Sequence, residues 1–194
     1  MLQSTDISPK SSEILQAAQI LIQERGFNGF SFRDVAAKVG IRSASIHYHY
    51  PTKTELACAV TAHYRAAFQD KIDGFRDSDM SQVEKLRAYG GLFVATLDEG
   101  KKVCLCGVLA SEAETLPTQV RKEVGQFFDA QRDWLVAVID AGKASGEIRS
   151  DIDATTFASS FIAALEGGMI IARSVEQPLR LKQTIDQHIA FITN

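Results

Sequence analysis

The stretch that decides the fold of this chain runs from Ser31 to Lys53 and reads SFRDVAAKVGIRSASIHYHYPTK. It predicts two short helices separated by a glycine turn. Ser31 stands where it can cap the first helix, with Asp34 as its capping-box partner three residues later. Gly40 supplies the left-handed residue that commonly ends a helix. The stretch therefore holds both a start signal and a stop signal for its first helix.

The second helix of this stretch is expected to begin at a cap formed by Ser43. Ala44 and Ile46 are expected to hold it against the first helix. Its other face gathers small donors, rings and a cation, namely Arg42, Ser43, Ser45, His47, Tyr48 and His49. A helix–turn–helix needs this arrangement, because its second helix enters the major groove of DNA while the first braces it on the backbone. The stretch therefore predicts DNA binding.

Length and composition favour an all-α protein. The chain has 194 residues, of which 45% are hydrophobic and 23% charged, enough for one fair-sized core or for a small domain joined to a larger one. Only four prolines occur, and apolar residues recur at every third or fourth position. No apolar run reaches the roughly 18 residues of a membrane span, and the first ten residues lack the apolar core of a signal peptide. A cytoplasmic protein without a membrane segment is expected.

Charge is distributed unevenly along the chain. The whole sequence has a net charge of −3, which by itself argues against a nucleic-acid partner. Residues 31–53, however, hold four basic residues and one acidic residue, whereas the chain beyond residue 56 holds 15 basic and 19 acidic residues. A local patch attracts phosphate more effectively than the global sum repels it. The charge therefore does not exclude DNA.

The rest of the chain also reads as helices, about nine in total. Residues 1–7 are expected to be disordered, after which Pro9 opens a helix that stops at Gly26. Thr52 and Glu55 form a second capping box. Beyond the opening stretch, helices are expected over residues 53–74, 81–97, 103–115, 118–143, 151–173 and 178–192.

A linked set of residues between positions 26 and 56 matches a known pattern. The set is Gly26-Phe27, Ser31-Phe32-Arg33-Asp34-Val35-Ala36, Val39-Gly40-Ile41, Ser45-Ile46, Tyr48-His49-Tyr50 and Lys53-Thr54-Glu55-Leu56. As a set, these residues resemble the TetR family of one-component transcriptional regulators. The later helices are similar to the family in number and length only. The resemblance implies a homodimer that binds a near-palindromic operator, and a small molecule in the C-terminal core that releases the DNA.

The domain organisation follows from this resemblance. It implies an N-terminal three-helix helix–turn–helix domain over residues 1–52 and a larger helical ligand-binding and dimerisation domain over residues 53–194. The helix over residues 53–74 would span roughly 33 Å at 1.5 Å per residue, long enough to join the two. Helices 151–173 and 178–192 carry more apolar surface than a terminal hairpin needs, and so are expected to form a four-helix dimer interface. That they only close the monomer core is the alternative.

Carried over by position, the resemblance implies roles in DNA binding. Arg33 would lie at the groove and could pair bidentately with guanine. Base edges would be faced by Arg42, Ser43, Ser45 and His47. Phosphates would be held by Ser31, Tyr48, His49 and Lys53. The family usually has tyrosine where His47 stands and often lysine where Ser43 stands, so this chain departs from the pattern at two base-facing positions.

A ligand cavity is expected among the aromatic residues of the C-terminal helices. The candidates are Tyr64, Phe68, Phe93, Cys104, Phe127, Phe128, Trp134, Phe161 and Met169. His63, Glu112 and Glu114 could add polar contacts. Plain core packing is the alternative, because aromatic residues at helical spacing usually fill a core.

The pair Cys104 and Cys106 admits two interpretations. Both can be small core residues, and at this spacing on a helix their thiols diverge, which disfavours a disulfide between them. Alternatively they form a redox or electrophile sensor, because Lys101 and Lys102 near a helix start would stabilise a thiolate. With Cys58 the cysteine count is odd, which fits a reducing compartment.

The sequence thus predicts a dimeric DNA-binding repressor that a small apolar or electrophilic ligand controls. In the expected mechanism the ligand fills the core, helix 53–74 tilts, and the two recognition helices lose the separation that successive major grooves demand. The alternative is a small helical enzyme or carrier whose N-terminal unit binds a protein partner. No catalytic set or phosphate loop is evident, and His47 and His49 would point in different directions on a helix. No catalytic residue, cofactor or metal is therefore predicted.

Overall fold

The computed structural model describes residues 8–100 and 102–193, so the expected disorder of residues 1–7 lies outside the described residues. Within the described residues lie nine α-helices and one isolated antiparallel bridge between Ile148 and Thr193. The helices are α1 (Pro9–Arg25), α2 (Phe32–Val39), α3 (Ser43–His49), α4 (Lys53–Arg76), α5 (Gln82–Asp98), α6 (Leu105–Ser111), α7 (Thr118–Ser145), α8 (Ala154–Ser174) and α9 (Leu179–Ile192). The predicted all-α class is confirmed.

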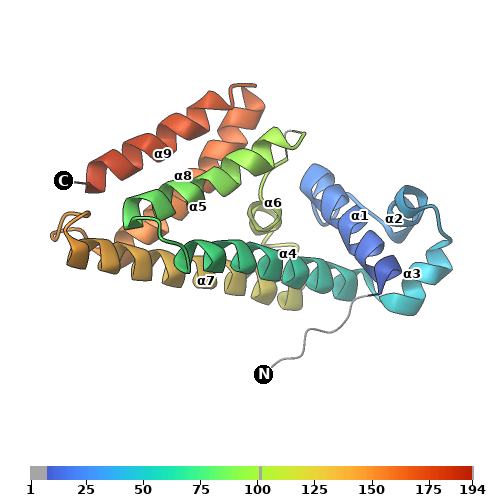
Figure 1. Ribbon diagram of the computed structural model, residues 1–194. Coiled ribbons are helices and arrows are strands. Elements are labelled where there is room, and N and C mark those ends of the chain that lie inside the picture. The colour runs from blue at the N-terminus through green and yellow to red at the C-terminus, as the bar shows by residue number, and fades with distance from the viewer. Residues whose placement is uncertain (1–7, 101, 194) are drawn as a thin grey trace.

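Helices α1, α2 and α3 form a small unit at one end of an elongated molecule, and the longer helices form a body at the other end (Figure 1). The predicted capping box of α2 is present, because the Ser31 side chain accepts from the Asp34 amide while the Asp34 carboxylate accepts from the Ser31 amide. Gly40 ends α2 with φ 74° and ψ 35°, the left-handed conformation that the sequence predicted.

Two expectations about α3 were wrong. Arg42, not Ser43, occupies its N-cap position, and no side chain caps the helix. Ile46 is the only buried residue of α3, and Ala44 is exposed instead of facing α2. A helix of seven residues makes barely two turns, so burying Ile46 leaves most of its other residues exposed.

Helix α4 joins the N-terminal unit to the body. The predicted capping box between Thr52 and Glu55 starts it, and its 24 residues reach about 36 Å at 1.5 Å per residue. It continues past the expected end at Gly74 to Arg76, because nothing near Gly74 interrupts the helix. The helix packs against α1 in the unit and against α7 in the body, so it can couple them.

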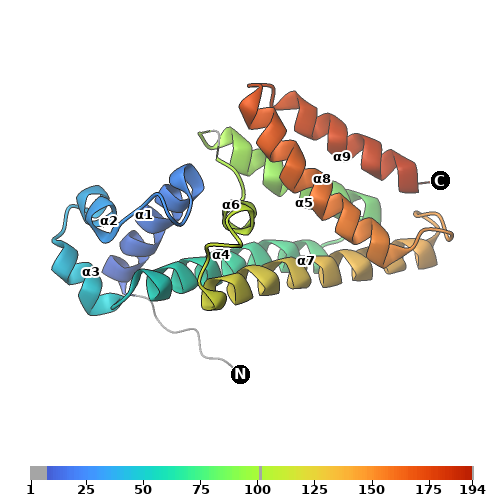
Figure 2. The same cartoon turned by 180° about the vertical axis from the view of Figure 1, so that it is seen from behind.

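The body consists of α5 to α9. A third capping box, between Ser81 and Glu84, starts α5 close to the beginning of the helix expected over residues 81–97, and α7 lies beside α4 in both views (Figure 2). Helix α6 is shorter than the expected range of 103–115. No side chain caps its start, and Pro117 disfavours helical geometry in the residue before it.

The hairpin of α8 and α9 covers α5 and α7 on one side of the body (Figure 2). Asp153 caps α8, whereas Asp151 pairs with Arg149. At Gly168 a Cβ atom would lie 2.9 Å from Leu181 Cδ1, and at Gly90 a Cβ would lie 3.0 Å from Ile185 Cδ1. Gly168 on α8 and Gly90 on α5 therefore let α9 approach both of these helices closely.

Among the described helices, α8 alone is long and apolar enough, by length and composition, to cross a membrane. It combines many alanines and isoleucines with two charged residues, Glu166 and Arg173, and core helices of soluble proteins pass the same test. Here Phe157, Leu165 and Met169 bury one side of α8 against the other helices.

Candidate nucleic-acid interface and effector region

The outward face of α3 holds the most exposed large apolar side chain in the described residues. Tyr48 is 86% exposed, and Ala44, one turn earlier, is exposed on the same face, opposite the buried Ile46. The ring of Tyr48 is therefore available for contact with a partner. Sequence reasoning missed Ala44 as part of this face because it placed the residue inward.

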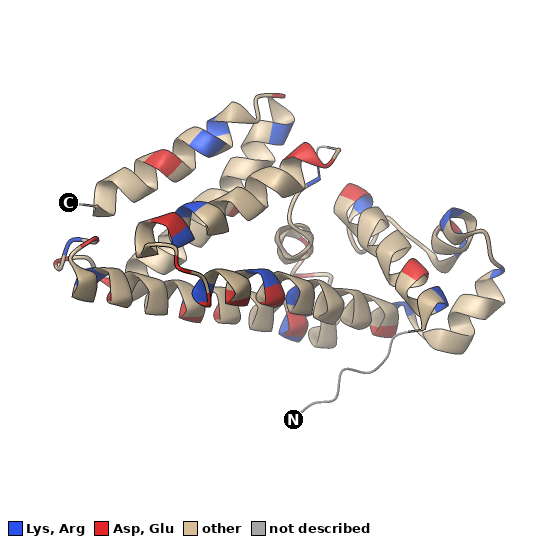
Figure 3. Cartoon of the chain, viewed as in Figure 1, with Lys and Arg blue, Asp and Glu red and all other residues tan. Residues whose placement is uncertain are grey.

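Cations lie beside this face, although α3 itself carries no charged residue (Figure 3). Arg33 on α2 and Arg42 at the start of α3 are both exposed. Neither guanidinium forms a hydrogen bond or ion pair with another described residue. Ser45 and His49 are exposed as well, and the His49 ring lies edge-on to Tyr48 with 5.4 Å between centroids. Arg33 and Arg42 thus have free donors on α2 and at the start of α3.

Two of the predicted DNA contacts are also engaged within the protein. The Ser31 hydroxyl donates to Asp34 Oδ2 at 2.5 Å, and this hydrogen bond is the largest cause of a lowered Asp34 pKa. The His47 ring packs edge-on against Phe32 at 4.5 Å, and its Nδ1 lies 3.3 Å from the Pro51 carbonyl oxygen. These contacts hold α2, α3 and the following loop together.

The ammonium of Lys53 lies over two aromatic rings at the start of α4. Its Nζ is 4.7 Å from the ring centroid of Phe27 and 4.6 Å from that of Phe30. Burial lowers the pKa of Lys53, and Glu112 opposes that shift. Lys53 is therefore a positive charge held in place beside the turn between α1 and α2.

Three hydrogen bonds tie the N-terminal unit to residues 103–115 of the body. Gln23 Nε2 donates to the Val103 carbonyl at 2.7 Å, and both residues are buried. The remaining two join the α1–α2 turn to the end of α6: Phe27 N to Glu112 Oε2 at 2.7 Å and Asn28 Nδ2 to Thr115 Oγ1 at 2.8 Å. Glu112, expected near a ligand, instead holds this turn. No sequence signal reveals these pairs, because their members stand about 80 positions apart.

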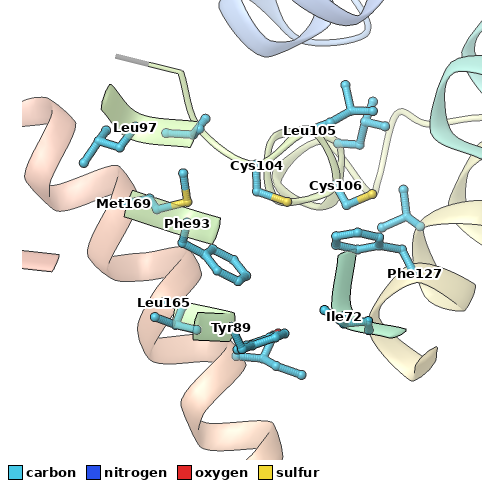
Figure 4. Packing of buried hydrophobic residues seen from close by; sticks show 14 of the residues in the cluster. Ile72, Tyr89, Phe93, Leu97, Cys104, Leu105, Cys106, Phe127, Leu165 and Met169 are labelled. Carbon is cyan, nitrogen blue, oxygen red and sulfur yellow. The ribbon is translucent and has the colours of Figure 1, made fainter. Parts of the chain in front are cut away.

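Most of the predicted effector residues meet in the core of the body. The Phe68 ring contacts Phe93 at 5.9 Å and Phe127 at 5.3 Å, and Trp134 stacks on Tyr89 with 5.6 Å between centroids. Figure 4 shows Cys104 and Met169 beside the rings of Phe93 and Phe127. Phe161 contacts Tyr89 at 6.1 Å. Tyr89, which the sequence did not single out, is the centre of this cluster and donates to Gln131 Oε1.

The cavities of the body lie around this cluster and not within it. Trp134 lines a groove of about 550 Å³ between α4, α5 and α7. Tyr64 and Phe68 line about 170 Å³ between α1, α4 and α5, together with His63. Phe128 lines about 310 Å³ between α7 and α8. The sequence predicted one aromatic-lined cavity, whereas the structure distributes the predicted residues among several separate cavities.

Models of two families match the chain. Residues 14–60 match "Bacterial regulatory proteins, tetR family", and residues 83–188, more than half of the chain, match "Tetracyclin repressor-like, C-terminal domain". The chain belongs to the TetR family. A crystal structure of a TetR-family transcriptional regulator from Agrobacterium tumefaciens is 34% identical, with a TM-score of 0.91 over 95% of this chain and 98% of that chain.

Two TetR-like relatives have names that state a role. The HTH-type transcriptional repressor DhaR of Mycobacterium sp. (strain GP1) is 24% identical over 186 residues, 95% of this chain and 91% of that protein. The HTH-type transcriptional repressor KstR2 of Mycobacterium tuberculosis is 26% identical over 149 residues, 76% of this chain and 73% of that protein. Both similarities extend beyond the helix–turn–helix into the body.

The cysteines of this TetR-family body are free thiols, and two of them are deeply buried. Cys104 is 2% exposed, and burial raises its pKa well above the ordinary value. The expected stabilisation of a thiolate was therefore wrong. The Nζ atom of Lys102 lies 3.9 Å from Glu99 Oε2, and Lys101 falls outside the described residues. A sensor at Cys104 or Cys106 stays a prediction, and at Cys104 the raised pKa disfavours the thiolate.

Exposed apolar side chains gather on the α8–α9 hairpin. Apart from Tyr48, the exposed large hydrophobic side chains among residues 8–100 and 102–193 are Ile170, Ile171, Val175, Leu179 and Phe191. All five belong to α8, to α9 or to the short connection between them. An apolar face of this kind marks a protein contact.

Proposed function

We propose that this TetR-family chain is a DNA-binding transcriptional repressor that a small molecule releases from its operator. The exposed face of α3, with Tyr48 at its centre and Arg33 and Arg42 beside it, carries the proposal. The names of DhaR and KstR2 as transcriptional repressors support it. The alternative of an enzyme or carrier is not favoured, because the named relatives are regulators.

In this proposal α3 lies in the major groove and its neighbours divide the work. Arg33 and Arg42 have the free guanidinium donors that bidentate pairing with guanine requires. Ala44 offers a methyl group of the kind that contacts thymine. The remaining base-facing candidates are Ser43, Ser45 and His47. The phosphate-holding candidates are Ser31, Tyr48, His49 and Lys53, with Ser31 and His47 also bracing the fold.

The proposed repressor is a homodimer through α8 and α9. Ile171 and Phe191, which are 55% and 62% exposed, are the kind of residues that a four-helix interface would bury. A two-fold dimer places its recognition helices about one DNA turn, roughly 34–36 Å, apart, so the operator is expected to be near-palindromic. The operator lies in the cytoplasm, which is the proposed location of the protein.

Two connections can carry the effector's signal to α3. Helix α4 runs from the body into the N-terminal unit, and residues 103–115 hold the α1–α2 turn through Glu112 and Thr115. An effector that shifts α6 or α4 would rotate the unit and change the distance between the two recognition helices. This retains the tilt of α4 that the sequence suggested and adds α6 as a second connection.

A gel-shift experiment tests the proposal. Folded dimeric protein is titrated against the DNA upstream of its own gene, at low salt, with an unrelated fragment of equal length as competitor. Retention of the upstream fragment in preference to the competitor is expected. No retention, or equal retention of both fragments, would contradict a specific repressor.

A further inference from the structure

A lysine is buried beside the groove of about 550 Å³ between α4, α5 and α7. Lys85 of α5 is only 8% exposed, whereas lysine side chains are almost never buried without a partner of opposite charge. Its Nζ donates to the Arg76 carbonyl oxygen, 3.1 Å away, and forms no ion pair with a carboxylate of the described residues. An ammonium has three N–H donors, so two of them have no acceptor among residues 8–100 and 102–193.

This ammonium lies at the wall of the groove. Lys85 lines the groove, and so does Arg76, whose carbonyl oxygen accepts the hydrogen bond, so both ends of that bond belong to lining residues. Gln82, one turn before Lys85 on α5, lines the groove as well. The two remaining donors of the ammonium are therefore within reach of a molecule that enters the groove.

The other charged groups of this wall already have partners. The Arg76 guanidinium pairs with Asp73 and, at 3.9 Å, with Asp77. Asp133, an exposed lining residue on α7, lies 3.1 Å from Arg132. Its carboxylate would repel a second negative charge on a ligand, so the groove suits a molecule with a single one.

The α7 side of the groove is mostly apolar. Trp134 and Val138 are buried there, and Trp134 is held in place by stacking on Tyr89 at 5.6 Å between centroids. Three alanines at positions 130, 137 and 141 continue the same face of α7 at helical spacing. Their small side chains leave a hollow whose volume is within the range of small-molecule sites.

We propose that this groove binds an amphipathic monocarboxylate, whose carboxylate accepts from the Lys85 ammonium and whose apolar body lies against Trp134 and Val138. Because it names the chemical class of the effector, this inference rests on the proposed function. A carboxylate completes the ion pair that a buried lysine needs, whereas an alcohol leaves its charge unpaired and an amine adds a second cation. Helix α4 ends at Arg76, so the occupant lies against the end of α4 that is remote from the N-terminal unit and can bias the tilt of the helix.

Isothermal titration calorimetry of the full-length protein without DNA tests the site. The probe is 4-phenylbutyrate, and 4-phenylbutan-1-ol and 4-phenylbutylamine are the matched neutral and cationic compounds. Saturable binding of the carboxylate is expected, about tenfold or more tighter than the alcohol, with no binding of the amine. Lys85→Met keeps the length of the side chain and removes its charge. It should weaken carboxylate binding by about thirtyfold or more and abolish the preference for the carboxylate over the alcohol.

Two further variants locate the site. Ala137→Phe adds a ring to the exposed part of the α7 wall without changing the ammonium, and should weaken carboxylate and alcohol binding alike, by about tenfold or more. Lys122→Met removes an exposed lysine of α7 that does not line the groove, and is the matched control; a change below about threefold is expected. Circular dichroism melts check that all three variants fold.

Several outcomes would contradict the proposal. Equal binding of the carboxylate and the alcohol by the native protein, tighter binding of the amine, or no binding of the carboxylate would each show it to be wrong, whatever the variants do. A folded Lys85→Met protein that still prefers the carboxylate would also overturn it. The titration contains no DNA, so a chain that failed the gel shift could still bind the carboxylate. A chain that passed the gel shift and bound no carboxylate would overturn this inference alone.

Discussion

The outer face of α3 and the flank of α8 that faces α6 each hold a side chain in an environment that is unusual for its chemistry. On α3, Tyr48 holds an aromatic ring in water, whereas on α8, Glu166 holds a carboxyl oxygen inside the protein. An exposed ring can be covered by a large, flat partner such as DNA, whereas the buried carboxyl already lies against Cys104 and Gly107 of α6. The exposed ring therefore concerns binding, and the buried carboxyl concerns the stability of the fold.

The largest expected effect concerns the α3 side of this comparison. Arg33→Ala should weaken binding to the operator by about 1–3 kcal/mol, roughly 5- to 150-fold, and should weaken non-specific binding much less, because a bidentate base contact is lost. Lys53→Ala should weaken both about equally. Fluorescence anisotropy with operator and scrambled duplexes measures both. Arg121→Ala, an exposed arginine at the start of α7, is the control and should change neither. A uniform loss for Arg33→Ala and a specific loss for Lys53→Ala would reverse the assigned roles.

The packing around the Glu166 carboxyl can be changed without substituting Glu166 itself. Gly107→Ala should reduce the free energy of unfolding by about 1 kcal/mol, because the new methyl group meets Glu166 Oε2 and the buried carboxyl must move aside. Urea denaturation measures the change. Gly125→Ala on α7, where a Cβ atom meets nothing within 4 Å, should instead stabilise the protein by about 0.5–1 kcal/mol. Equal changes in the free energy of unfolding of the two variants would show that the close contact between Gly107 and Glu166 has no effect on stability.

The dependence of the free energy of unfolding on pH tests the buried carboxyl of Glu166. The folded state raises the pKa of Glu166, so it holds the proton more tightly than the unfolded chain does. The contribution of Glu166 is therefore fully present below its ordinary pKa of 4.5 and is lost as pH rises toward the raised value. Glu166→Gln should flatten this decline. Urea midpoints across that window provide the measurement; a native slope in Glu166→Gln would contradict the buried acid.

The smallest effect on stability is expected at the most exposed residue. Tyr48→Ala should leave the free energy of unfolding within about 0.5 kcal/mol of its native value, because its side chain touches little of the protein. Operator binding should nevertheless fall, which anisotropy would detect. Tyr48→Phe, which keeps the ring, tests the hydroxyl alone. A large loss of stability in Tyr48→Ala would mean that the ring belongs to the fold and not to an interface.

How much of this could be predicted from sequence depends on how far apart the interacting residues stand. The capping boxes at Ser31, Thr52 and Ser81 are local, three residues in span, and all three helix starts were predicted. The inward placement of Ala44 failed because a seven-residue helix offers too few turns to define a face. Glu166 reads as an ordinary helical glutamate, since α6, which buries it, lies some 60 positions away.

The three hydrogen bonds between the N-terminal unit and residues 103–115 also limit how strongly a gene could be switched. Each contributes a net ~0.5–1.5 kcal/mol, so together they amount to about 1.5–4.5 kcal/mol. An effector that acted by breaking them could change the affinity for the operator by a factor on the order of 10 to 2000, and no further. Thermodynamic reciprocity requires that bound operator weaken the effector by the same factor. The induction threshold in a cell would then depend on how many operators the protein has to serve.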